Sequence, residues 1–233
     1  MILSNECYLT DSCLKYKNGN CDINDKQFCI KLFKIDYLYE QSLLSNSQRH
    51  NVKLRLDADG TDREAFYKLR DIQNSILEFV SNGKNLYIHS AICGNGKTEW
   101  AIKLIQSYIN NIWHKSDLRC RALFINVPRF LLSLKDNISD KSDYISHIKK
   151  IVLDADLVVW DEIGVANLSK FEHEHLLNLI NTRIDYDKSN IYTSNLSGDE
   201  LKEKIGERLY SRVVNLSTDI EFFGSDKRGV NNK

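Results

Sequence analysis

The chain has 233 residues, which is enough for one substantial domain and a small additional module. Its 32 Lys and Arg residues balance 32 Asp and Glu residues, so overall charge gives no argument for a nucleic-acid partner, although a local basic face is still compatible with one. Hydrophobic residues make up 42%, ample for a packed core, but the longest apolar stretches have the length of strands, which excludes a membrane-spanning helix. The beginning of the sequence lacks the pattern of a signal peptide, and we expect a cytoplasmic protein with no membrane partner.

Four of the six cysteines lie in the first 35 residues: Cys7, Cys13, Cys21 and Cys29. Disulfides are rare in the cytosol, and a segment of this size cannot build a core of its own. Four thiolates satisfy the tetrahedral preference of zinc and also suit an iron–sulfur cluster. Scattered thiols in a partly ordered tail are the alternative without a metal. Our first expectation is a zinc-binding module over residues 1–35.

Residues 36–60 are expected to link this module to the main domain, residues 61–233. Thr61 and Glu64 have the spacing of a capping box, with Thr61 as the N-cap, which predicts that a helix begins here. Ser-Asn-Gly at residues 81–83 ends it. The helix has apolar residues at spacings of three and four, namely Phe66, Leu69, Ile72, Ile76 and Phe79.

From residue 86 onward, strand patterns and helix patterns alternate. Strands are predicted over residues 86–89, 120–127, 156–161, 190–194 and 220–223, the last at an edge of the sheet. Helices are predicted over residues 97–113, 128–134, 144–153, 171–186 and 199–214. Such alternation predicts an α/β fold in which helices flank a parallel sheet.

Residues 91–98 read Ala-Ile-Cys-Gly-Asn-Gly-Lys-Thr and lie between a predicted strand and a predicted helix. Backbone N–H groups of such a loop surround phosphates, Lys97 can reach the β- and γ-phosphates, and Thr98 can bind Mg²⁺. The pattern usually has Gly where Ala91 stands, and Ala fits if its φ is negative. The loop therefore predicts ATP or GTP binding. The residues expected to contact the nucleotide are Gly94, Asn95, Gly96, Lys97 and Thr98.

A second motif is the apolar strand at residues 157–160, which is followed directly by Asp161 and Glu162. Asp161 is expected to complete the Mg²⁺ shell, and Glu162 is placed to polarise an attacking water. Asn195 follows the next predicted strand and is expected to contact the γ-phosphate or that water. Two adjacent carboxylates favour nucleotide hydrolysis over transfer of the phosphoryl group to another substrate.

Arg208 and Arg212 are four residues apart, so they lie on one face of a predicted helix. Two arginines on one face can stabilise the phosphates bound to a neighbouring subunit, or they can form ion pairs at the surface.

These motifs, with Ser-Asp-Lys-Arg at residues 225–228, resemble the bacterial helicase loaders of the DnaC/DnaI type. Loaders of this type are P-loop AAA+ ATPases, some are carried by phages, and the family also resembles the ATPase subunits that assist transposases. The resemblance covers about residues 60–229. The roles it implies are Walker A for Lys97 and Thr98, Walker B for Asp161 and Glu162, first sensor for Asn195, arginine finger for Arg212 with Arg208 beside it, and second sensor for Arg228.

The resemblance implies an ATPase that hydrolyses ATP with Mg²⁺, assembles into a homo-oligomer when ATP is bound, and loads a hexameric replicative DNA helicase onto single-stranded DNA. The setting is the cytoplasm of a bacterium or of a phage-infected host. Some loaders carry a zinc-bearing N-terminal domain that holds the helicase, which supports the zinc expectation by analogy.

Two alternatives stay open at this point. The first is a transposition-type ATPase that acts on duplex DNA, and the second is a nucleotide-sensing adaptor with little turnover. Lys149 and Lys150, close to His147, can contact phosphates, although a solvated helix face is the commoner origin of so short a basic pair.

Overall fold

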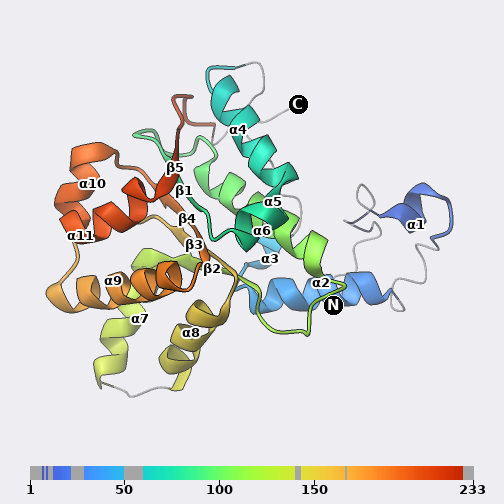
Figure 1. Ribbon diagram of the computed structural model, residues 1–233, viewed down its shortest axis with the longest axis horizontal. Coiled ribbons are helices and arrows are strands. Elements are labelled where there is room, and N and C mark those ends of the chain that lie inside the picture. Colours follow the sequence, from blue (N-terminus) through green and yellow to red (C-terminus); the bar gives the residue numbers. More distant parts are fainter. Residues whose placement is uncertain are drawn as a thin grey trace.

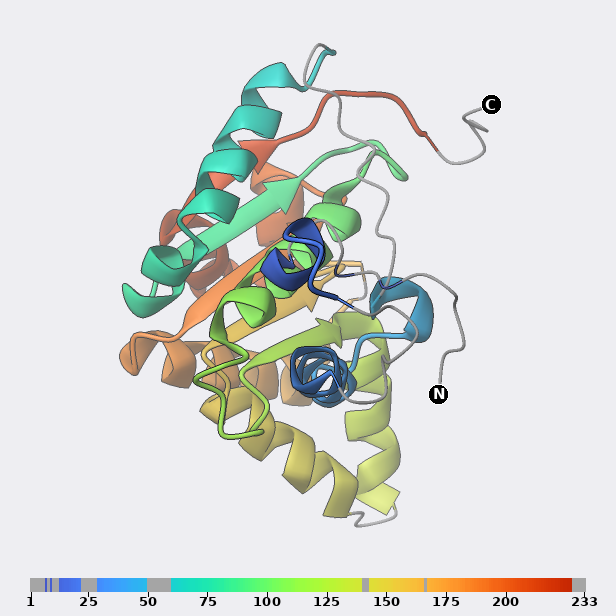
Figure 2. The same ribbon diagram turned by 90° about the vertical axis from the view of Figure 1, so that its right-hand side faces the viewer.

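The computed structural model describes residues 7, 9, 13–21, 29–49, 60–139, 143–165 and 167–227. Within this part, a five-stranded parallel sheet has the strand order β2-β3-β4-β1-β5. The strands are β1 (Asn85–His89), β2 (Ala122–Asn126), β3 (Leu157–Asp161), β4 (Ser189–Ser194) and β5 (Ser217–Glu221). Helices cover both faces of the sheet, which confirms the predicted α/β fold (Figure 1). Figure 2 shows that the strand arrows point towards one edge.

One face of the sheet carries α2 (Ile30–Gln41), α4 (Arg63–Asn74), α5 (Ile76–Ser81) and α6 (Lys97–Ile112). The other face carries α7 (Val127–Ser139), α8 (Asp143–Asp154), α9 (Lys170–Asp185), α10 (Gly198–Ile205), α11 (Glu207–Tyr210) and the π-helical turn η3 (Ser211–Asn215). Two short helices, α1 (Leu14–Lys17) and α3 (Asn46–Arg49), belong to the N-terminal part.

Alternate residues of each strand enter opposite hydrophobic cores. On β3, Val159 packs with α6 on one side, whereas Val158 and Trp160 pack with α8 and α9 on the other. All five residues of β3 are buried, because helices cover both faces of a parallel sheet. The continuous apolar run at residues 157–160 is the sequence signal of this arrangement.

The first helix of the main domain begins later than predicted, and the predicted capping box is wrong. Helix α4 begins at Arg63 with Asp62 at the N-cap, and no side chain caps it. Glu64 instead forms an ion pair with Lys68, with 2.6 Å between the charged atoms. A break at Ser75 then divides the predicted helix into α4 and α5.

The predicted helix over residues 199–214 is also divided. Gly206 has a φ of +76°, which ends α10, and α11 and η3 follow it. A methyl group at Gly206 would come close to the imidazole of His173, so a side chain is disfavoured here for two reasons.

The predicted boundary between residues 35 and 36 falls inside helix α2, which packs on the same core as α6. The carbonyl of Ser42 accepts a hydrogen bond of 2.9 Å from the N–H of Phe124 on β2, which is one of the two edge strands of the described sheet. Gln106 on α6 donates a hydrogen bond of 2.9 Å to the carbonyl of Gln48. Part of the predicted linker is therefore fixed to the main domain, while the domain bounds themselves stay a prediction.

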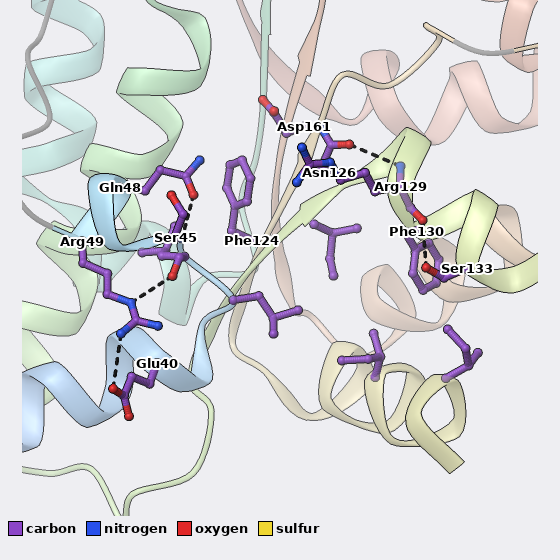
Figure 3. Close-up of a pocket in the computed structure, with 15 residues that line it drawn as sticks. Glu40, Ser45, Gln48, Arg49, Phe124, Asn126, Arg129, Phe130, Ser133 and Asp161 are labelled. Carbon is purple, nitrogen blue, oxygen red and sulfur yellow. Dashed lines mark hydrogen bonds and ion pairs between the residues drawn. The ribbon is translucent and has the colours of Figure 1, made fainter. Parts of the chain in front are cut away.

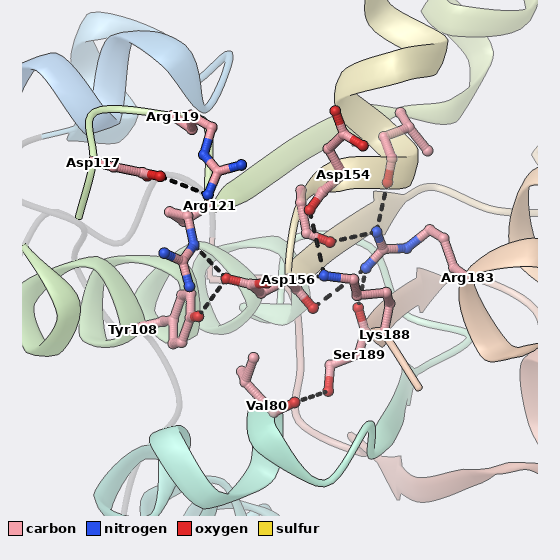
Figure 4. Close-up of polar contacts among 12 residues, drawn as sticks. Val80, Tyr108, Asp117, Arg119, Arg121, Asp154, Asp156, Arg183, Lys188 and Ser189 are labelled. Atoms are coloured by element: carbon pink, nitrogen blue, oxygen red, sulfur yellow. Dashed lines mark hydrogen bonds and ion pairs between the residues drawn. The ribbon is translucent and has the colours of Figure 1, made fainter. Parts of the chain in front are cut away.

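Arg183 on α9 is a buried cation that lies at the edge of the sheet where the strands begin (Figure 4). It is 1% exposed, and it donates hydrogen bonds of 2.5–2.8 Å to the carbonyls of Val152, Ala155 and Ser189 and to Oδ1 of Asn190. Burial lowers the pKa of Arg183 to about 10, so the guanidinium is still charged at neutral pH. Its acceptors come from the end of α8 and the start of β4, so Arg183 joins these two segments to α9.

Asp156 lies beside this guanidinium and gathers a second set of donors (Figure 4). Its carboxylate accepts hydrogen bonds from Tyr108, Arg121 and Lys188, those from Tyr108 and Lys188 being 2.9 and 3.0 Å long. Burial alone would raise its pKa, but these three donors hold the pKa of Asp156 below its ordinary value.

Arg183→Leu should reduce the free energy of unfolding by about 3 kcal/mol or more, because three buried carbonyls would lose a charged donor. Arg119→Leu is the matched control, since Arg119 is exposed and pairs with Asp117 at the surface. Its effect should stay within about 0.5 kcal/mol. Urea unfolding of both variants provides the comparison, and equal losses would contradict a structural role for Arg183.

Candidate functional site

The loop between β1 and α6 has the backbone of a phosphate-binding loop. Gly94 and Gly96 have φ values of +74° and +112°, which the predicted pattern requires of glycine. Ala91 is not among the described residues with positive φ, so its methyl group fits where the pattern usually has Gly. Helix α6 begins at Lys97, and its N-terminus points into the loop, as an anion site requires.

The side chain of Lys97 is 7% exposed and lies inside this loop. Its ammonium donates hydrogen bonds of 2.8 Å to the carbonyl of Ile92, 3.2 Å to Oδ1 of Asn95 and 3.4 Å to the carbonyl of Ser90. An ammonium among loop carbonyls is placed to exchange these acceptors for phosphate oxygens. The predicted place of Lys97 is consistent with this geometry.

Asp161 joins the loop to the centre of the sheet. It ends β3, is 4% exposed, and its Oδ1 accepts hydrogen bonds of 2.8 Å from Thr98 and 2.7 Å from Thr193. Burial, and then the charge of Glu162, raises the pKa of Asp161. A desolvated carboxylate beside a hydroxyl oxygen fits the oxygen ligands that Mg²⁺ prefers, so Asp161 and Thr98 are the residues that would hold this ion.

Glu162 follows directly and has a φ of +62°, a left-handed conformation that is rare for a residue with a side chain. Its N–H donates a hydrogen bond of 3.0 Å to Oγ1 of Thr193. Its Oε2 accepts one of 2.9 Å from Nδ2 of Asn126, which ends β2 and lies opposite Asp161 in the sheet. Asn126 is not among the predicted site residues, although a polar residue at the end of a predicted strand is a usable signal.

Asn195 is half-buried and follows β4, the strand between β3 and β1. The loop that carries it is held by Tyr87, whose hydroxyl donates a hydrogen bond of 2.6 Å to the carbonyl of Leu196. The same edge of the sheet therefore carries five of the predicted site residues: Lys97, Thr98, Asp161, Glu162 and Asn195.

Arg208 on α11 and Arg212 in turn η3 are both exposed. Turn η3, which contains Arg212, leads into β5, and the first residue of β5, Ser217, pairs with Asn85 at the start of β1. Arg212 therefore lies towards the opposite edge, where its Nε donates a hydrogen bond of 2.8 Å to Oδ1 of Asn181. The predicted second sensor, Arg228, lies outside the described residues.

The four N-terminal cysteines share one neighbourhood, but the structure does not support the predicted zinc site. Desolvation, and then the nearby thiols of Cys13, Cys29 and Cys7, raises the pKa of the Cys21 thiol. Among the residues that the structure describes, however, no three His, Cys, Asp or Glu side chains are arranged to hold a metal ion. Cys7 and Cys13 instead pack against the hydrophobic core, as ordinary thiols do.

A pocket of about 730 Å³ opens beside the site, between the α2–α3 segment on one side and β2, α7 and α8 on the other (Figure 3). Asp161 and Asn126 line it, Phe124 and Phe130 contribute apolar surface, and Arg129 lines it from the first turn of α7. The N-terminal part of the chain therefore borders a space that reaches the carboxylate of the site.

The fold and the glycine loop are those of a nucleotide-binding domain of the P-loop class. The family model described as IstB-like ATP binding protein matches residues 58–214, and the chain belongs to this family. No curated protein matches the chain.

Solved structures resemble the chain in fold. The DnaC helicase loader superposes with a TM-score of 0.62 at 19% identity, covering 77% of this chain and 100% of that one. A putative primosome component from Streptococcus pyogenes serotype M3 gives 0.59 at 20% identity, with coverages of 82% and 98%. DnaI gives 0.59 at 16% identity, with coverages of 82% and 100%.

None of the described helices is both long and apolar enough to cross a membrane.

Asp161→Asn should separate stability from function. The amide still offers Thr98 and Thr193 an acceptor oxygen but removes a desolvated charge, so the thermal midpoint without Mg²⁺ and nucleotide should equal or exceed that of the parent. The pKa of Asp161 is raised in the folded state, so protonation stabilises the parent as pH falls through that pKa. The difference in thermal midpoint between the parent and Asp161→Asn should therefore shrink at low pH.

Mg²⁺-dependent ATP turnover by Asp161→Asn should nevertheless fall by about 100-fold or more. Glu162→Gln is the control for stability, since Glu162 is less buried than Asp161. A lower midpoint for Asp161→Asn than for the parent at neutral pH would contradict the account.

Proposed function

We propose that this protein is an ATPase that loads or remodels a hexameric replicative DNA helicase on single-stranded DNA. The observation that carries the proposal is the carboxylate of Asp161, which receives the hydroxyl of Thr98 from the phosphate-binding loop and lies next to Glu162. This pairing of a loop hydroxyl with a strand-end carboxylate suits the binding of a nucleoside triphosphate with Mg²⁺.

In the proposed reaction, the N–H groups of residues 94–98 and the ammonium of Lys97 bind the β- and γ-phosphates. Thr98 and Asp161 hold Mg²⁺, which when bound neutralises charge on the phosphate oxygens. Glu162 accepts the proton of the attacking water, and Asn195 orients that water or the γ-phosphate. Asn126 keeps Glu162 turned towards β2 until the substrate is in place.

The choice of client rests on the resemblance to helicase loaders and on the position of the N-terminal part. The name of the DnaC structure identifies that protein as a helicase loader. In this chain, the α2–α3 segment contacts both α6, through Gln106, and β2, through Phe124. A helicase bound to the N-terminal part would therefore be linked through this segment to α6, which follows the phosphate-binding loop, and to β2, which ends at Asn126. The protein would act in the cytoplasm as a homo-oligomer.

Membership of the IstB-like family favours a second candidate, a transposition-type ATPase that acts on duplex DNA. Turnover measured with single-stranded and duplex DNA of equal length, together with capture of a purified hexameric helicase, separates the two. Stimulation by single strands and capture of the helicase support the loader. Stimulation by duplex DNA alone, without capture, supports the transposition-type ATPase.

Lys97→Ala and Glu162→Gln should fail at different steps. Lys97→Ala removes the charged side chain that meets the phosphates, so ATP affinity measured by calorimetry should be lost. Glu162→Gln leaves Asp161 to hold Mg²⁺, so ATP should bind with parental affinity while turnover falls by about 100-fold or more. Parental turnover by Glu162→Gln would show that another group activates the water.

Arg212→Ala should bind ATP normally but hydrolyse it slowly, and the defect should be restored by a partner subunit. Arg212 lies towards the edge of the sheet opposite the loop of its own chain, so in this proposal the guanidinium acts on a neighbour's phosphates. An equimolar mixture with Lys97→Ala pairs an intact loop with an intact arginine, and turnover should reappear. Each variant alone at the same total concentration is the control. A mixture that oligomerises but stays inactive would contradict the assignment.

A further inference from the structure

The chain crosses the phosphate-binding loop after β5. Residues 222–227, which we call the strap, run beside the loop that follows β1 (Figure 2). The N–H of Lys227 donates a hydrogen bond of 3.1 Å to the carbonyl of Gly94. The carbonyl of Gly224 accepts one of 3.4 Å from Nδ2 of Asn95. The strap therefore contacts two residues of the loop that is expected to hold the phosphates.

Asp62 anchors the strap from the other side. Its carboxylate is 4% exposed and lies at the N-terminus of α4. Oδ1 accepts a hydrogen bond of 2.6 Å from the N–H of Phe223, and both carboxylate oxygens lie 3.1 Å from the N–H of Gly224. A methyl group at Gly224 would overlap Oδ2 of Asp62, so the close approach requires glycine. One buried carboxylate thus accepts the N–H groups of two successive strap residues.

Asn95 transmits the position of the strap to Lys97. Its side chain is fully buried, and Nδ2 donates to Oγ of Ser90 at 2.7 Å as well as to Gly224. Its Oδ1 accepts the ammonium of Lys97 at 3.2 Å. The strap therefore contacts the nitrogen of the Asn95 amide, and the oxygen of the same amide contacts the ammonium of Lys97. The contacts form a continuous path from Asp62 through Gly224 and Asn95 to Lys97.

We infer that Asp62 is a positioning residue for nucleotide binding, which acts by holding the strap against the phosphate-binding loop. This inference rests on the proposed ATP binding. A loop that is ordered before ATP arrives loses less conformational entropy on binding, so releasing the strap should weaken binding. The strap contacts Asn95 and Gly94, whereas Asp161 and Glu162 receive their partners from β2, β4 and Thr98, so the chemical step should change less than ATP binding does.

The test uses the full-length chain and Mg²⁺-ATP. In Asp62→Ala the Kd for ATP should rise roughly tenfold or more, and KM should rise with it, whereas kcat at saturating ATP should stay within about twofold. Asp62→Asn keeps one acceptor oxygen and should give an intermediate Kd. Amide exchange at Phe223 and Gly224 should become faster in Asp62→Ala. Glu64→Gln is the matched control, because Glu64 is an exposed carboxylate of the same helix that pairs with Lys68.

Gly224→Ala provides an independent test, because it keeps Asp62 but pushes the strap away from the carboxylate. It should raise the Kd for ATP as Asp62→Ala does, and it decides the question if Asp62→Ala does not fold. The inference about Asp62 would be overturned if the parent binds ATP and either Asp62→Ala or Gly224→Ala binds it as tightly as Glu64→Gln. The proposed ATP binding would still stand in that case. A parent chain that binds no ATP would overturn the proposed function itself.

Discussion

The carboxylate of Asp161 is the contact on which the nucleotide site depends. It accepts the hydroxyls of Thr98 and Thr193, which come from the first turn of α6 and from β4. This meeting follows from the strand order, because β4 lies between β3 and β1 and brings its end beside both motifs. The carboxylate is buried with a raised pKa, so its charge is costly until a cation neutralises it. A site of this kind suits an ion such as Mg²⁺ that arrives with the nucleotide.

The two edges of the sheet serve different purposes. At the edge where the strands begin, Arg183 and Asp156 have their hydrogen-bonding groups satisfied by several segments, which stabilises the fold. At the edge where the strands end, Glu162 is held at a positive φ and Lys97 rests on loop carbonyls. Contacts that a ligand could replace thus lie at the edge that carries the candidate site, whereas the contacts at the opposite edge stabilise the fold.

The features predicted from the sequence were those with local causes. Alternating periodicities predicted the sheet, and the glycine loop and the strand-end carboxylates predicted the candidate site, because each depends on adjacent residues. Asp62 was beyond local reasoning, since its partners, Phe223 and Gly224, lie at the other end of the domain. Cysteine spacing did not determine whether the thiols share a metal. The packing of α2 was predictable, because Ile35, Leu38 and Tyr39 already have helical apolar spacing.

The central claim is that Lys97, Thr98 and Asp161 form one site for ATP with Mg²⁺. Calorimetric titration of the full-length chain with ATP, once with Mg²⁺ and once with a chelator, tests it most directly. The account predicts one ATP per chain and an affinity at least about tenfold weaker without Mg²⁺, because the charge of Asp161 would then repel the phosphates. A chain that binds no ATP, or binds it equally well without Mg²⁺, would contradict the account.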